Sequence, residues 1–409
     1  MKRTSPFFSV SVLALLAAMP AAAQEATGAA SFFADGDAGL DLRYRLELVD
    51  QDGFSKKATA STLLSKIWYK TAEVNGFSAY VEGTNVTSIG KELYNSTVNG
   101  NILRPVVADP EVTEFNQGYI QYKTGKLTLK AGRQGINLGH QRFVGTVGFR
   151  QNDQTYDAAS MVLQPTKDLT AIYGYVWNVN RIFGNKHPFG DLDTNTQVIN
   201  VIYSGFEAAK ITAYAYLIDL NDAPVFGLSS STYGARLEGN KAVSDSLKLG
   251  YQLEYASQSD YKDNPNNFSA DYWNASLSAS SSGFTGQIAY ELLGSDNGVA
   301  FQTPLATLHK FNGWADKFLS TPGAGLQDLN ASLAYKVPGK TGLGGALLKV
   351  VYHDFSSDVG NSSFGTEWDF LVSKKVTKNI TASVKAAFYN ADSFATDTSR
   401  FWFTVGAKF

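Results

Sequence analysis

The chain has 409 residues, with 35 lysines and arginines against 37 aspartates and glutamates, a formal net charge of −2 and no cysteine. The lack of cysteine excludes a disulfide scaffold, a thiolate metal site and a cysteine nucleophile, and a charge near zero argues against a nucleic-acid partner, which a basic surface would attract. Charged residues make up 18% of the sequence, fewer than the roughly one quarter that is usual in soluble globular proteins.

The first residues predict a secretory signal peptide. Lys2 and Arg3 precede an apolar run from Phe7 to Ala18, and the alanines just before Gln24 offer a small-residue cleavage site. The apolar run is too short to cross about 30 Å of hydrocarbon. We therefore expect residues 1–23 to be removed on export and residues 24–38 to form a short periplasmic lead-in. A cysteine-free exported chain fits a bacterial envelope.

From residue 39 onward, apolar and polar side chains alternate with a period of two, which is the pattern of β-strands. Residues 40–48 alternate leucines and a tyrosine with charged side chains, and residues 247–255 and 401–409 repeat the pattern. The same alternation predicts strands near residues 58–72, 77–87, 114–124, 127–133, 154–164, 169–178, 196–204, 209–218, 231–240, 269–280, 284–293, 327–337, 346–355, 365–375 and 379–390. These segments make about eighteen strands of the length that a tilted membrane strand requires.

The connections between these segments alternate between short and long. Turn-rich short links lie at 75–76, 124–126, 165–168, 205–207, 281–283 and 338–340. Longer polar stretches lie at 88–113, 134–153, 179–195, 219–230 and 294–326. Outer-membrane barrels sort their connections in this way, with short periplasmic turns and long extracellular loops. The sequence therefore predicts an all-β fold, a transmembrane antiparallel β-barrel of about 18 strands over residues 39–409, in the bacterial outer membrane.

Two further expectations concern the ends of the barrel. In residues 294–326, apolar side chains recur at helix-like intervals, which predicts a short helix over the barrel mouth. The last strand is rich in aromatics and ends at Phe409, so we expect it to engage the outer-membrane assembly machinery. We expect a monomer whose outer face contacts membrane lipid.

The third extracellular loop and its flanking strands carry three arginines with few local carboxylates, namely Arg133, Arg142 and Arg150. A guanidinium group offers a planar donor fork that suits carboxylates. If the loop folds into the lumen, these arginines either contact a passing anion or tie the loop to acidic wall residues such as Asp41, Glu47 or Glu82. Both interpretations stay open at this point.

The side chains assigned to the lumen carry both signs of charge, with a mild excess of positive groups. The solute-contact candidates are Arg43, Arg45, Arg133, Arg142, Arg150, Arg236, Lys248, Lys385 and Arg400. Their expected acidic partners are Asp41, Glu47, Glu82 and Glu254. Charges that line a water-filled pore are screened over about 8 Å at physiological salt, so this mixture predicts a modest anion preference.

Several segments resemble the alginate-export-type outer-membrane porins. The resemblance is carried by Leu42 to Glu47 and by the pieces GRQ, LGHQRFVG and RQNDQTYD between residues 132 and 157. It extends to His309 to Phe311 with Gly313 to Asp316, and to Gly325 to Asp328. It implies an eighteen-stranded barrel. One departure is Phe149, where the family pattern implies tryptophan.

We therefore expect a porin or channel for the passive passage of small hydrophilic solutes, including anionic sugars or oligosaccharides. The alternatives are a dedicated channel that exports an alginate-like exopolysaccharide and, from another class, a plugged adhesin or scaffold barrel. The four histidines, His140, His187, His309 and His353, show no metal-ligand spacing, and no phosphate-binding loop precedes a helix. We expect no cofactor, no metal and no enzymatic reaction.

Overall fold

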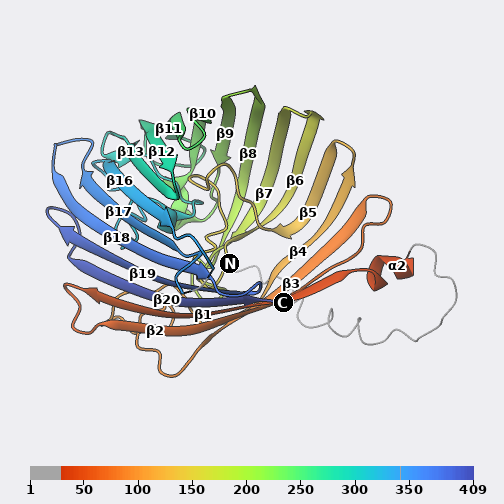
Figure 1. Cartoon of the computed structure of the whole chain (residues 1–409), viewed down its shortest axis with the longest axis horizontal. Helices are drawn as coiled ribbons and strands as arrows, with labels where there is room; N and C mark the ends of the chain where they lie inside the picture. The colour runs from red at the N-terminus through yellow and green to blue at the C-terminus, as the bar shows by residue number, and fades with distance from the viewer. Residues whose placement is uncertain (1–28, 341) are drawn as a thin grey trace.

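The computed structural model describes residues 29–340 and 342–409. Within these ranges, 18 antiparallel strands form one sheet in which each strand pairs with the next along the chain. The last strand, β20 (Thr398–Lys408), returns to pair with the first, β1 (Asp37–Gln51), in a register that sets Asp41 opposite Lys408. The sheet is therefore the closed barrel that the sequence predicts (Figure 1), and closure leaves no unpaired strand edge.

The predicted signal peptide lies outside the described residues. The chain is described from a short helix, α2 (Ala29–Ala34), in the predicted lead-in, and β1 follows it. The remaining barrel strands are β2 (Ala58–Lys70), β3 (Phe77–Ser88), β4 (Val112–Thr124), β5 (Leu127–Gln134), β6 (Thr155–Thr166), β7 (Leu169–Asn180), β8 (Asp191–Phe206), β9 (Ala209–Ile218), β10 (Ser230–Ala242), β11 (Lys248–Asp260), β12 (Ser269–Ser281), β13 (Phe284–Leu293), β16 (Leu326–Lys336), β17 (Leu347–Ser356), β18 (Ser363–Lys375) and β19 (Ile380–Ala391).

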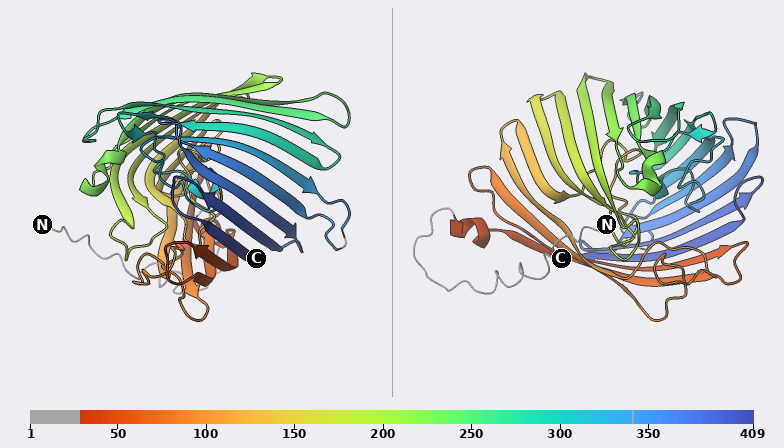
Figure 2. Two further views of the ribbon diagram at one scale, coloured as in Figure 1. Left: turned by 90° about the vertical axis from the view of Figure 1, so that its left-hand side faces the viewer. Right: turned by 180° about the vertical axis from the view of Figure 1, so that it is seen from behind.

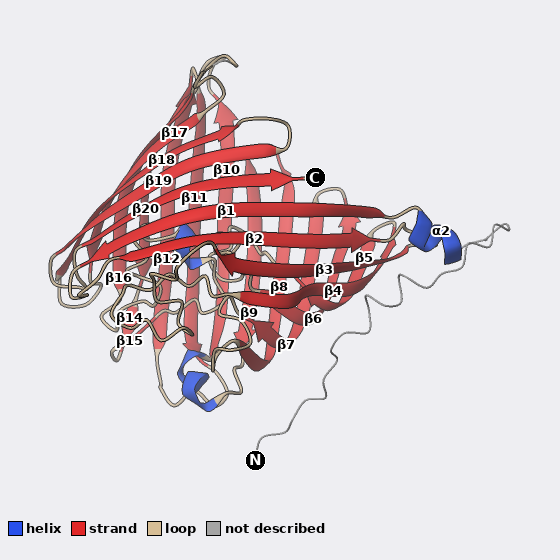
Figure 3. Ribbon diagram, turned by 90° about the horizontal axis from the view of Figure 1, so that it is seen from below, coloured by secondary structure: helices blue, strands red, loops and turns tan. Residues whose placement is uncertain are grey.

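Long loops gather at one end of the barrel, here called the mouth, and most links at the other end, the turn end, are short (Figure 3). Four of the mouth connections recur below: loop 2 (89–111), loop 3 (135–154), loop 4 (181–190) and loop 7 (294–325). One turn differs from the prediction, because the link between β16 and β17 runs over 337–346 rather than 338–340. Among the described residues, no helix has the length and apolarity needed to cross a membrane.

Loop 7 corrects the expectation of a helix over the mouth. Its helical content is the short 3₁₀ turn η2 (Leu308–Lys310), and a small hairpin of β14 (Ser295–Asp296) and β15 (Val299–Ala300) precedes it. A second 3₁₀ turn, η1 (Ala223–Leu228), lies between β9 and β10. The apolar spacing in loop 7 reflects residues that pack in several directions inside the barrel rather than on one helix face.

Alternation along each strand sorts side chains between the two faces of the barrel wall. Outward-facing Ile67, Leu277 and Ile288 are 69%, 70% and 64% exposed, as lipid-facing residues should be. The views in Figures 1 and 2 show the strands following one another around the ring in chain order. Toward the turn end many inward-facing residues are charged, Lys66, Lys375 and Lys408 among them.

Near the mouth the lumen holds a packed core. Phe143 of loop 3 lies within 5.9 Å, between ring centroids, of Tyr214, Tyr272 and Phe301. Tyr156 is fully buried, and its hydroxyl donates to the carbonyl oxygen of Gly145 at 2.8 Å. Apolar packing therefore anchors loops 3 and 7 inside the barrel in addition to the polar contacts described next.

Candidate functional site in the barrel lumen

Loop 3 crosses the lumen and is attached to opposite parts of the wall. At one end, His140 Nε2 lies 2.6 Å from Glu238 Oε2 on β10. At the other end, the side chain of Gln151 donates to Thr62 Oγ1 on β2 at 2.9 Å and accepts from Arg43 Nε on β1 at 2.8 Å. Because β10 and β2 lie far apart in the strand order, a loop that is fixed to both must span the interior.

Arg142 lies at the junction of loop 3, loop 7 and the wall. Its guanidinium donates to Glu291 Oε1 on β13 at 2.7 Å, to Thr303 Oγ1 at 3.1 Å and to Asn312 Oδ1 at 3.0 Å. The residue is 4% exposed. Burial alone would lower the pKa of Arg142, but the contact with Glu291 raises it above its ordinary value, so the charge is permanent and locally compensated.

Arg150 connects the same two loops to the seam where the barrel closes. It donates to Glu47 Oε2 on β1 at 3.1 Å and to Asp316 Oδ2 of loop 7 at 2.7 Å. Arg400 on β20 lies 3.0 Å from the other oxygen of Glu47 and 3.4 Å from Asp316. Asp109 of loop 2 lies 3.8 Å from Arg150. The cluster joins three loops to both seam strands.

His309 continues this cluster toward β19. Its Nδ1 lies 2.6 Å from Asp316 Oδ1, and its Nε2 lies 2.6 Å from Lys385 Nζ. Since the ammonium group can only donate, Nε2 acts as the acceptor and Nδ1 carries the proton that is shared with Asp316. The imidazole is therefore neutral, and its ring stacks on Phe149 at 3.5 Å between centroids.

Burial has opposite consequences for the two members of this pair. It lowers the pKa of His309 to about 3, which keeps the ring neutral. Burial alone would raise the pKa of Asp316, but His309, Arg400 and Arg150 together hold it below its ordinary value. Asp316 is thus an anion that holds cations from loop 3 and from the wall.

Loop 7 is also held through its backbone. The amide nitrogen of Ala315 donates to Glu367 Oε1 at 2.7 Å, and that of Trp314 donates to Asp369 Oδ2 at 3.3 Å, both on β18. The side chain of Asn312 donates to Glu291 at 2.6 Å. The acidic residues of the wall therefore serve largely as acceptors for the infolded loops.

The other predicted residues lie on the lumen face, and all but Lys248 have specific partners. Arg45 lies 3.9 Å from Asp109 and 4.2 Å above the ring of Phe149. Arg236 lies 3.8 Å from Glu254, and Asp41 lies 3.1 Å from Lys408. The remaining two are Glu82, 3.6 Å from Lys66, and Lys248, which is exposed at the start of β11.

Arg133 is the exception. It forms an ion pair with Asp157 at 2.7 Å, and Asp157 follows Tyr156, which faces the lumen core. Because successive strand residues face opposite sides, Arg133 and Asp157 lie on the outer face of the barrel. The sequence prediction of a lumen position for Arg133 is corrected accordingly.

Two cavities lie on opposite sides of residues 147–154 of loop 3, here called the partition. The outer cavity, about 590 Å³, opens among the mouth loops and touches Val147, Arg150 and Gln154. The inner cavity, about 550 Å³, touches Gly148 and Asp153 and extends to the turn end. Its lining includes the lysines at 66, 375, 378 and 408.

Arg43 secures the partition from the wall. In addition to Gln151, its guanidinium donates to the carbonyl oxygen of Gly148 at 2.8 Å and to that of Arg150. All three acceptors are neutral amide or carbonyl oxygens, so no carboxylate bonded to Arg43 cancels its positive charge. The inner cavity therefore has, beside the partition, a cation that no carboxylate contacts directly.

Two cations that the sequence prediction missed line the outer cavity. Arg181 of loop 4 stacks on Phe183 at 4.8 Å, and Lys317 of loop 7 donates to Thr398 Oγ1 at 2.7 Å. Within residues 29–340 and 342–409, neither has a carboxylate at ion-pair distance. Both residues lie in loops, where side chains do not alternate between two faces. The strand alternation that assigns residues to the lumen therefore could not identify them. Asp109 and Asp316 were missed for the same reason.

Histidine and carboxylate groups meet in several places, including His353 Nδ1 with Asp328 Oδ1 at 2.8 Å. In the His309 pair the second ring nitrogen contacts Lys385, and in the His353 pair it lies 3.7 Å from Asp369. These partners leave no serine in the position of a hydrolytic nucleophile in either pair. The described part of the chain holds no group of three or more histidines and carboxylates arranged for a metal ion.

Comparison with known proteins places this geometry in a structural context. Residues 36–201 match the alginate export family. The structure is similar to Acinetobacter baumannii OccAB4, with a TM-score of 0.72 at 14% identity over 91% of this chain and 98% of that one. It is also similar to the outer membrane protein opdK of Pseudomonas aeruginosa, with a TM-score of 0.70 at 16% identity over 91% and 98%.

This chain has the fold of an outer-membrane β-barrel. A. baumannii OccAB2 is similar as well, with a TM-score of 0.71 at 16% identity over 93% of this chain and 99% of that one. The search of curated proteins gave no match. The predicted porin-type barrel fold is confirmed, and the predicted resemblance to the alginate export family is confirmed over the matched residues of the barrel.

Proposed function

We propose that this barrel is a channel for the passive passage of small hydrophilic solutes with a modest preference for anions. The observation that carries the proposal is the pair of lumen cavities separated by the partition. A solute would enter the outer cavity, pass residues 147–154 and leave through the inner cavity. The positive groups that line this route without a carboxylate at ion-pair distance, among the described residues, are Arg181 and Lys317 outside the partition and Arg43, Lys375 and Lys378 inside it.

Anion preference is a consequence of pairing rather than of the number of positive residues. Arg142 and Arg150 are neutralised by carboxylates at 2.7 to 3.1 Å, so their main contribution is to hold loop 3 in place. The uncompensated cations are few, and salt screens each one over about 8 Å. A weak preference for anions, including sugar acids, is the expected result.

A second candidate is a dedicated export channel for an alginate-like polysaccharide, and the family match over residues 36–201 favours it. Passage of a polymer would require loops 3 and 7 to move out of the lumen together. The third candidate, a plugged scaffold barrel, is favoured by the same packed loops. In all three cases we propose a monomer with no reaction and no cofactor, inserted by the outer-membrane assembly machinery.

Planar-bilayer recording separates these candidates. A porin gives stable single-channel steps, and a salt gradient gives a reversal potential on the anion side. An exporter gives small or no steps until the loops are shortened, and uronate oligomers then block it. Wild-type protein that inserts and shows heat-modifiable migration but carries no current would contradict the channel proposal and support the plugged scaffold.

A further inference from the structure

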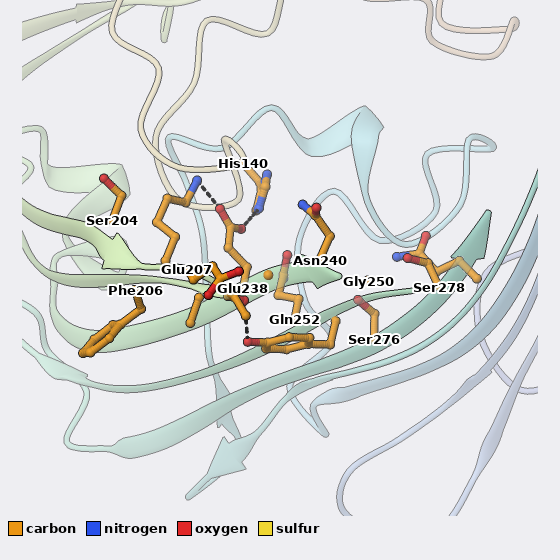
Figure 4. A pocket seen from close by; sticks show the side chains of 16 residues that line it. His140, Ser204, Phe206, Glu207, Glu238, Asn240, Gly250, Gln252, Ser276 and Ser278 are labelled. Carbon is orange, nitrogen blue, oxygen red and sulfur yellow. Dashed lines mark hydrogen bonds and ion pairs between the residues drawn. The ribbon is translucent and has the colours of Figure 1, made fainter. Parts of the chain in front are cut away.

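A third recess lies in the lumen wall, apart from the two cavities of the main path. It has a volume of about 520 Å³ and is formed by the turn-end halves of β8 to β13, with His140 of loop 3 at its edge. Figure 4 shows the side chains that surround it. We refer to it as the wall pocket. Its size is within the roughly 300–1,000 Å³ of small-molecule sites.

The lining of the wall pocket is rich in neutral groups that can both donate and accept hydrogen bonds. Amide side chains come from Asn240, Gln252 and Gln287, and hydroxyls come from Ser276 and Ser278. Gln252 donates to Asn274 at 2.8 Å. In the described part of the chain, the side chains of Asn240, Ser276 and Gln287 have no hydrogen-bond partner, so they are free to bind a solute.

The charge of Glu238 at the pocket edge is already satisfied. Glu238 accepts from Lys210, lies 3.1 Å from Arg236 Nε and lies 2.6 Å from His140 Nε2. Glu207 also lines the pocket. A carboxylate ligand would meet these two acidic side chains without a free cation beside them. Charge therefore disfavours an anionic ligand here, in contrast to the outer cavity.

The backbone allows a ligand to approach the pocket floor closely. Gly250 lies on β11 opposite Ser278 of β12, and a β-carbon at Gly250 would come within 2.6 Å of Ser278 Oγ. Glycine at this position leaves the hydroxyl uncovered. The result is a shallow polar floor bordered by amides, with several hydrogen-bonding groups at neighbouring strand positions.

Resting on the proposed channel function, we propose that the wall pocket binds the hydroxyl groups of a neutral saccharide of one or two units. Sugar hydroxyls both donate and accept, as the amides and serines of the pocket do. Since the unpaired groups are hydrated when the pocket is empty, binding exchanges water for hydroxyls at small cost. The pocket would slow neutral sugars inside the channel and so favour them over non-hydroxylated solutes of similar size.

The test uses the full-length barrel in planar bilayers, with sucrose added to both sides. We expect sucrose to interrupt the wild-type current in a saturable manner. The double substitution Asn240→Leu and Gln287→Leu should raise the half-blocking concentration roughly tenfold, as expected for the loss of two hydrogen bonds. Gln121→Leu, which removes an amide from the lumen face of β4 outside the wall pocket, should leave it unchanged.

Equal block of the double variant and the wild type, or stronger block by a uronate disaccharide than by sucrose, would overturn the wall-pocket proposal while the channel remained. If the wild type carries no current, the channel proposal fails, and sucrose binding to the detergent-solubilised barrel then decides on the pocket. Saturation-transfer NMR should show sucrose signals for the wild type and the Gln121→Leu variant. Their absence in the wild type would contradict the proposal. Heat-modifiable migration verifies that each variant is folded.

Discussion

Arg150 of loop 3 and Asp316 of loop 7 form a 2.7 Å ion pair inside the barrel, where each residue is also tied to a seam strand. The two loops are therefore not independent obstacles in the lumen. Releasing one removes the partner of the other, and a buried charge left without its partner is strongly destabilising. Several expected outcomes follow from this coupling.

Asp316→Asn should loosen both loops at once, because it removes the anion that holds Arg150, Arg400 and His309. Breaking a buried pair on one side costs about 3–5 kcal/mol. We expect a lower unfolding temperature in detergent and noisier, larger single-channel currents. Asp263→Asn, at an exposed position in the connection between β11 and β12, is the matched control. If the single-channel current of Asp316→Asn is as quiet as that of the wild type, the ion pair between Arg150 and Asp316 does not hold the loops.

Replacing residues 137–152 by a short glycine linker should widen the path, because most of the partition leaves the lumen. Conductance should rise, and the anion preference should fall because Glu291, Glu47 and Asp316 lose their arginine partners in loop 3 and add negative charge to the lumen. Single-channel recording in symmetric and then asymmetric KCl measures both quantities. If the conductance is unaltered, the path does not pass the partition.

The double variant Arg181→Gln and Lys317→Gln should shift the reversal potential toward cations, since both groups line the outer cavity without a carboxylate partner. The effect should exceed that of removing the exposed Lys262 of the β11–β12 connection by Lys262→Gln. The main effect of Arg142→Gln and Arg150→Gln should be loop release. A reversal potential unaffected by the Arg181 and Lys317 changes would place the selective site elsewhere.

Lys317 gives the anion preference a pH dependence. Burial, with Arg400 nearby, lowers the pKa of Lys317 to about 8, so the ammonium loses its charge as pH rises through this value. The anion preference should therefore weaken between about pH 7 and 9. Lys317→Arg, which stays charged, should remove this dependence. The measurement is the reversal potential as a function of pH over this range. If the wild type and Lys317→Arg change equally with pH, Lys317 is not the group that titrates.

The seating of loop 7 should weaken in acid. The folded pKa of His309, about 3, lies below the ordinary value of about 6.5. A released or unfolded loop therefore binds the proton more readily, and stability is lost as pH falls from about 6.5 toward 3. Loop 7 should become cleavable by an acid-stable protease in this range. His309→Gln should show a smaller change between pH 7 and 4, and identical profiles would contradict the assignment.

Much of the barrel could be predicted because a strand facing lipid on one side and water on the other must alternate. That rule places Arg43, Arg45 and Glu47 on the lumen face from the sequence alone. The same rule also predicts the outer face for Arg133. Arg133 lies three positions after Lys130 on β5, so the two side chains face opposite sides, and Lys130 faces the lumen. The inference for Arg133 used charge alone and neglected the strand period, and it was therefore wrong about the face.

The interior of the mouth was beyond such reasoning. The backbone nitrogen of Gln151 in loop 3 donates to Asp109 Oδ1 in loop 2 at 2.8 Å. No periodic pattern in the sequence of either loop predicts this contact. The family-like segments in loop 7, His309 to Phe311 and Gly313 to Asp316, indicated no partner for either one. Pairing decides which arginines are available to a solute, so the candidates could not be ranked from sequence. Phe149, a departure from the family pattern, stacks on His309.

The seam between β1 and β20 has a consequence for biogenesis. Its two strands are at opposite ends of the barrel sequence, so the ring cannot close until the C-terminal strand has been delivered. Glu47 on β1 and Arg400 on β20 meet each other and the Arg150 and Asp316 pair across that seam. If a nascent barrel closed before loops 3 and 7 were in place, Glu47 would lack Arg150 and Arg400 would lack Asp316. Insertion into the membrane and filling of the lumen are thus expected to finish as one event.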